Sequence, residues 1–127
     1  MKRKKLTASM IALVMSVSLP MTTYAANWYL EDGSVTVNAD NSGQTVTQGS
    51  NPAVSDEAPV ITQRESSVET GNTIAINASD NATANVTIKD INIKSSNDAI
   101  DVKGSSSANI TLEGDNKIFS ETGSALH

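Results

Sequence analysis

The chain of 127 residues carries a formal net charge of −5 and contains no cysteine. This length allows at most one modest domain. The lack of cysteine excludes disulfide frameworks, thiolate metal sites and lipid attachment through cysteine. The acidic balance argues against nucleic-acid binding, because DNA and RNA are themselves polyanions.

Residues 1–25 have the features of a secretory signal peptide. A basic start at residues 2–5 precedes an apolar stretch over residues 10–17, and the small residues Thr23 and Ala25 fit a signal peptidase site. We expect cleavage after Ala25 and a secreted protein, free or associated with the cell surface, without a membrane span. A retained anchor is the alternative, but the apolar stretch is short for a bilayer. Cleavage leaves five cations against fourteen acidic residues, a net charge of −9.

Residues 26–68 are predicted to form an N-terminal cap with irregular strands. Two short stretches over residues 27–39 flank a turn and read as strands. We expect Trp28, Tyr29 and Leu30 to cover the exposed first coil of the structure that follows, because an open sheet edge invites pairing with another chain. A platform on which sugars stack is the functional alternative, and it makes Trp28 and Tyr29 the candidate carbohydrate-binding residues.

Residues 69–127 contain an internal repeat. The segment Glu-Thr-Gly at Glu69 recurs at Glu121, 52 positions later, and the related segment 95–100 begins halfway between them. One position of the repeat alternates between glycine and asparagine, the residues that adopt left-handed backbone angles at least cost. A turn with positive φ is therefore expected at Gly71, Asn97 and Gly123.

The strands predicted within the repeat also recur at regular spacings. Ile74, Ile100 and Leu126 follow one another every 26 residues, and residues 84–88 match residues 108–112 at a spacing of 24. Each stretch alternates apolar and polar residues, which indicates a strand with one buried face. The positions expected to point inward are Ile74, Ile76, Val86, Ile88, Ile100, Val102, Ile110 and Leu112.

A period in the mid-twenties built from short strands is typical of a stacked solenoid. The predicted fold is all-β, a right-handed parallel β-helix with coils of 24–26 residues over 69–127, incomplete at its C-terminal end. A β-sandwich is the structural alternative, since short strands at similar spacing also suit it. The position-by-position match between coils favours the β-helix.

The stretch "NVTIKDINIKSSNDAIDVKG" over residues 85–104, followed by "NITLEGDNKI" over residues 109–118, carries a family resemblance. It resembles the secreted carbohydrate-binding β-helix domain proteins of Gram-positive bacteria, over residues 69–127 and less clearly over 27–68. Members similar to a clostridial pectin-binding protein bind acidic polysaccharide with calcium. The resemblance implies a polysaccharide, or a host or cell-wall glycan, as the partner.

Four aspartates are the candidate metal ligands. Asp98 and Asp101 lie three positions apart in one segment, and Asp90 and Asp115 are expected to stack in adjacent coils. Calcium prefers carboxylate and carbonyl oxygens, which turns of a β-helix present in rows. No linear calcium-binding motif accompanies them, so calcium is a candidate cofactor on composition and spacing alone.

No catalytic constellation is found in the sequence. The sole histidine is His127, and the sole arginine after the signal peptide is Arg64. A catalytic triad, a lyase base, a phosphate loop and a zinc motif are therefore not indicated. We expect a binding module for carbohydrate rather than an enzyme. The alternative is a surface structural or adhesin element without a specific sugar site.

Overall fold

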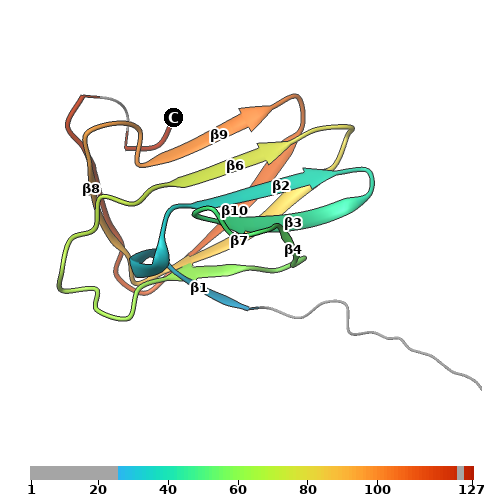
Figure 1. Ribbon diagram of the computed structural model, residues 1–127. Coiled ribbons are helices and arrows are strands. Elements are labelled where there is room, and N and C mark those ends of the chain that lie inside the picture. The colour runs from blue at the N-terminus through green and yellow to red at the C-terminus, as the bar shows by residue number, and fades with distance from the viewer. Residues whose placement is uncertain (1–25, 123–124) are drawn as a thin grey trace, which may run out of the picture.

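The computed structural model describes residues 26–122 and 125–127, and the chain over these residues is all-β (Figure 1). The predicted signal peptide and Gly123 lie outside the described residues. A short 3-10 helix, η1 (Leu30–Asp32), follows the first strand. The strands are β1 (Asn27–Tyr29), β2 (Val35–Asp40), β3 (Gly43–Gln48), β4 (Val54–Ser55), β5 (Val60–Thr62), β6 (Ile74–Ala78), β7 (Thr83–Lys89), β8 (Asn92–Ser95), β9 (Ile100–Gly104), β10 (Ser107–Glu113) and β11 (Lys117–Ser120).

The strands form three sheets. Sheet A has the order β1-β5-β7-β10, and sheet C consists of β8 and β11; both are parallel throughout. Sheet B has the order β4-β3-β2-β6-β9, with parallel pairs from β2 to β9 and antiparallel pairs from β2 to β4. From β7 onward the chain passes through sheets A, C and B in turn and then returns to sheet A.

The registers between strands are those expected from the repeat. Ile74 lies beside Ile100 in sheet B, and Ile100 forms an isolated parallel bridge with Leu126. In sheet A, β7 and β10 pair over their full length, with Val86 beside Ile110. The strands β6, β7 and β8 therefore each pair with a counterpart 24–26 residues later along the chain, and the predicted spacings are confirmed for them.

The core follows the predicted alternation where neighbouring strands cover it. The side chains of Ile74, Ile76, Val86, Ile88 and Ile100 are all buried. β-Branched residues suit such positions because their side chains pack well on a pleated surface. The alternating apolar positions therefore form one continuous core between the three sheets.

The expectation of burial is wrong for Leu112 and only partly met for Val102 and Ile110. Leu112 is 61% exposed, and the other two are half-buried. These residues belong to the last strands of sheets A and B, where no further strand covers the core. Position in the stack, rather than the alternation, decides their burial.

The expected positive φ at Gly71 and Asn97 is wrong, because neither residue is among those with positive φ. Hydroxyl groups turn the chain there instead. The backbone N–H of Asn72 donates to the Thr70 hydroxyl at 3.2 Å, and that of Asn97 donates to the Ser95 hydroxyl at 3.0 Å. A side-chain oxygen that accepts from the backbone two residues later makes a turn without left-handed angles.

The two ends of the stack differ. At the closed end, formed by β1, η1, β3 and β4, Leu30 is fully buried and Gln44 is 3% exposed. The Gln44 side chain accepts from the Asn85 N–H at 2.8 Å and donates to the Asn85 carbonyl at 3.0 Å, as a neighbouring strand would. At the open end β9, β10 and β11 are the terminal strands of their sheets among the described residues, and β9 lies at the top of Figure 1.

Candidate functional site

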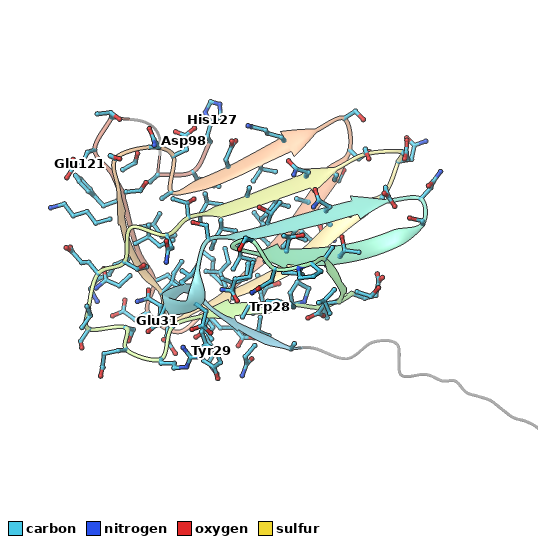
Figure 2. All side chains as sticks on the ribbon, viewed as in Figure 1. Trp28, Tyr29, Glu31, Asp98, Glu121 and His127 are labelled. Carbon is cyan, nitrogen blue, oxygen red and sulfur yellow. The ribbon has the colours of Figure 1, made fainter. Side chains whose placement is uncertain are left out.

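The two candidate carbohydrate-binding residues lie at the closed end, and each is held by another side chain (Figure 2). The Trp28 indole N–H donates to Asp56 Oδ2 at 2.8 Å. The guanidinium of Arg64 lies over the Tyr29 ring, 4.2 Å from its centroid. One face of the Tyr29 ring is therefore covered by a cation. Their use as a sugar platform stays a prediction.

Arg64 is fixed in place by two acidic residues of η1. Its guanidinium donates to both carboxylate oxygens of Asp32, at 2.9 and 2.8 Å, and this bond holds the Asp32 pKa below its ordinary value of 3.8. Burial acts to raise the Glu31 pKa, but hydrogen bonds from the backbone N–H groups of Glu65 and Arg64 outweigh it and hold the pKa low. Both carboxylates therefore stay ionised at neutral pH.

Three metal-ligating side chains meet at the corner between sheets C and B. Asp98 precedes β9, Asp101 lies on β9, and one ligand atom of each lies within 4.8 Å of the other and of one from His127. Figure 2 shows Asp98 and His127 side by side at this corner. We call these three residues the acidic corner. It is the one group of three or more potential metal ligands within residues 26–122 and 125–127.

Backbone hydrogen bonds hold His127 in the acidic corner. Its N–H donates to the Ile100 carbonyl at 2.8 Å, and its carbonyl accepts from the Val102 N–H at 3.0 Å. The histidine was not predicted as a ligand. The repeat spacing carries the signal that could have found it, because the bridge between Ile100 and Leu126 places His127 beside Asp101.

Asp101 has one oxygen with a partner and one without. Its Oδ2 lies 3.0 Å from the Lys103 ammonium, whereas its Oδ1 is buried and makes no hydrogen bond. A buried carboxylate oxygen without a partner is costly unless a cation or donor satisfies it. The carboxylates fit calcium, which takes oxygen ligands; the imidazole of His127 better suits zinc, nickel or copper.

The other two predicted ligands form a separate pair at the opposite end of β8. Asp90 Oδ1 accepts from the Asp115 N–H at 2.9 Å, and Asp115 Oδ2 lies 3.2 Å from the Lys117 ammonium. Asp90 itself has a φ of +51°. Asp90 and Asp115 lie beside each other and brace a turn, and β8 separates them from the acidic corner. The structure therefore divides the four aspartates into two pairs.

No pocket is found among the described residues. The same residues contain no helix that is long and apolar enough to cross a membrane.

Comparison with known proteins returned no match, whether to protein-family models, to curated proteins or to solved structures.

Proposed function

We propose that the chain is a secreted or cell-surface carbohydrate-binding module that holds an acidic polysaccharide through a divalent cation at the acidic corner. The observation that carries the proposal is the meeting of Asp98 and Asp101, predicted together from the sequence, with His127 at this corner. The module belongs to the class of secreted β-helix domains that the sequence resembles.

The strand arrangement supports the right-handed parallel β-helix of this proposal. The parallel pairs β6–β9, β7–β10 and β8–β11 join residues 24–26 positions apart, and from β7 onward the chain passes through the three sheets in one repeated order. Each such cycle is one coil of a solenoid, and its core is completed by the coils on either side. The antiparallel strands β3 and β4 are the cap of the first coil.

A cation is part of the proposal because of the charge of the chain. After loss of the signal peptide the net charge is −9, and such a surface repels a polyanion. The two carboxylates leave most positions of a bound calcium ion open, since calcium takes six to eight oxygen ligands. Uronate carboxylates and water would fill these positions and link the polysaccharide to the protein.

Binding to polygalacturonate with and without a chelator tests the proposal. We expect binding in calcium that disappears on chelation and in the double variant Asp98→Asn with Asp101→Asn. The matched control is Asp90→Asn with Asp115→Asn, which removes the same charge at the other end of β8 and should bind like the wild type. Chelator-insensitive binding, or equal losses in both double variants, would contradict the bridging mechanism.

Turnover is a separate outcome of the same experiment. The proposal is for binding alone, so the chain length of polygalacturonate should not change on prolonged incubation. A fall in its chain length would replace the binding module with an enzyme.

The second candidate function is a surface structural or adhesin element without a specific sugar site. Two observations favour it: no pocket is found among the described residues, and Trp28 and Tyr29 are held by Asp56 and Arg64. A folded protein that binds no acidic or neutral glycan on an array would support this candidate. Calcium-independent binding to a neutral glycan that is lost in Trp28→Ala would point instead to the aromatic platform.

A further inference from the structure

Asp56, in the connection between β4 and β5, is the one buried acidic residue in the described part of the chain, and it is 2% exposed. Its Oδ2 accepts from the Trp28 indole N–H at 2.8 Å and from the Ala26 N–H at 3.2 Å. Its Oδ1 accepts from the Ala58 N–H at 3.0 Å. An ionised carboxylate accepts hydrogen bonds and donates none. Such a charge is costly to bury unless a cation lies beside it.

The side-chain cations do not supply that charge. Of the five cations within residues 26–122 and 125–127, four form ion pairs with other carboxylates: Arg64 with Asp32, Lys94 with Glu121, Lys103 with Asp101 and Lys117 with Asp115. The fifth, Lys89, is exposed at the end of β7. In this part of the chain Asp56 therefore has hydrogen-bond donors but no side-chain cation as a partner.

The predicted signal peptidase site lies one bond before Ala26. Thr23 and Ala25 fit the small positions of such a site, so the bond to be cleaved joins Ala25 to Ala26. Hydrolysis breaks the C–N bond with one water. The oxygen of the water goes to the Ala25 carbonyl carbon, which becomes a carboxylate, and both hydrogens go to the Ala26 nitrogen. That nitrogen changes from a neutral peptide N–H into an ammonium group with three donors.

We propose that removal of residues 1–25 completes the closed end, because the Ala26 ammonium forms an ion pair with the buried Asp56 carboxylate. The charge arises on the nitrogen that already lies 3.2 Å from Asp56 Oδ2. The Ala26 carbonyl accepts from the Val60 N–H at 2.9 Å, so β5 holds the residue on its other side. The ion pair fastens β1, the first strand of sheet A, together with the Trp28 indole that shares Oδ2.

The proposal rests on the predicted cleavage site, and it does not involve the acidic corner. N-terminal sequencing of the secreted protein tests the cleavage by itself. We expect Ala26 as the first residue. Any other first residue would overturn the proposal, because the ammonium would then lie elsewhere, whereas carbohydrate binding at the acidic corner would be unaffected.

Two mature chains that differ by one alanine test the ion pair. One begins at Ala26 and the other at Ala25. The longer chain keeps the Ala26 N–H as a neutral donor but moves the ammonium about 3.5 Å along the chain. We expect the unfolding equilibrium constant of the Ala26 chain to be smaller by on the order of tenfold, because a hydrogen bond between charged groups stabilises more than one with a neutral donor. Urea denaturation measures it, and equal constants would overturn the proposal.

Asp56→Asn removes the charge of the acceptor while keeping its size. We expect this substitution to abolish the difference in unfolding constant between the two chains. The matched control is Glu57→Gln, which removes the same charge from the next residue, an exposed carboxylate that accepts from the Gln44 N–H at 3.0 Å. The difference between the chains should persist in this control. A difference that persisted equally in Asp56→Asn would contradict the ion pair.

Tryptophan fluorescence gives a second measurement that does not require the Asp56 variant to fold. Trp28 is the single tryptophan of the sequence, and its indole bonds the same carboxylate oxygen as the Ala26 nitrogen. We expect acrylamide to quench Trp28 less in the chain that begins at Ala26 than in the chain that begins at Ala25, because the ion pair holds β1 and its indole against the closed end. Identical quenching in the two chains would contradict the fastening of β1 by the ion pair.

Discussion

Single residues decide how the chain turns at its corners. Positive φ occurs at Asp90 and at Gly114, which follow the paired residues Lys89 and Glu113 of neighbouring strands. The sequence predicted that such a turn would recur, but placed it at Gly71, where a threonine hydroxyl supports the turn instead. Composition identifies residues that tolerate left-handed angles; it does not show which of them the chain uses.

Three glycine substitutions test this distinction. A Cβ at Gly104 (φ +110°) would lie 2.0 Å from the Ala78 carbonyl oxygen, and one at Gly114 (φ +72°) would displace the Asp90 carboxylate. We expect Gly104→Ala and Gly114→Ala each to lower the free energy of unfolding by about 1–3 kcal/mol, the range for strained backbone. Gly104→Ala should cost more, because a backbone carbonyl cannot rotate away.

Gly71→Ala is the control for these variants, because its Cβ would meet nothing closer than the Lys94 carbonyl oxygen at 3.9 Å. It should change the free energy of unfolding by less than ~0.5 kcal/mol, as substitutions in open surroundings do. Urea denaturation measures all three. A Gly71→Ala variant as unstable as Gly104→Ala would restore the original prediction of a strained turn at Gly71.

The candidate site was also predictable only in part at the residue scale. The spacing of Asp98 and Asp101 indicated that their carboxylates would lie close together, and the structure places them within 4.8 Å of each other. The distance of Asp98 and Asp101 from the other two aspartates depends on the length of β8. The alternation of apolar and polar residues does not predict that length. His127 joins the pair only through the register of sheet B.

At the scale of elements, alternation predicted strands well and their partners less well. β5 lies within residues 26–68, which were predicted to form irregular strands, and the match of β7 with β10 is residue for residue. The direction of β3 was not predictable in the same way. Its alternation of threonine and valine is equally compatible with parallel and antiparallel pairing, and its partner is set by the short turn after β2.

Paired positions of neighbouring strands should differ in their contribution to the free energy of unfolding. Ile88 is fully buried between Ile61 and Leu112 in sheet A, whereas Leu112 itself is 61% exposed. We expect Ile88→Ala to cost about 2–4 kcal/mol, as for other buried aliphatic side chains. Leu112→Ala should cost much less, because the site is open to solvent.

Thr87→Ala is the matched control for the face of the strand, since Thr87 neighbours Ile88 and points outward. Thr87→Ala should change the free energy of unfolding by less than ~0.5 kcal/mol. Thermal or urea denaturation at low protein concentration compares the three variants. A larger loss in Thr87→Ala than in Ile88→Ala would show that the inward and outward faces of β7 had been exchanged.

At the scale of the whole molecule, the two ends of the sheets differ over the described residues. β3 and β4 cover one end, and β9, β10 and β11 are the terminal strands at the other. In stacked structures each coil is stabilised mainly by its nearest neighbours, so stability is not uniform along the axis. β2, β6 and β7 have neighbouring strands on both sides, whereas β10 and β11 have one neighbour each. The sequence predicted the repeat and placed the N-terminal residues as a cover over its first coil, and the structure buries Leu30 at that end.

Hydrogen exchange should therefore reveal a gradient from the open end toward the closed end. The backbone N–H groups of β10 and β11 should exchange at least about tenfold faster than those of β2 and β6, because local opening costs least where fewest contacts are lost. Uniform protection across all strands in dilute solution would instead mean that the sheets open as a single cooperative unit.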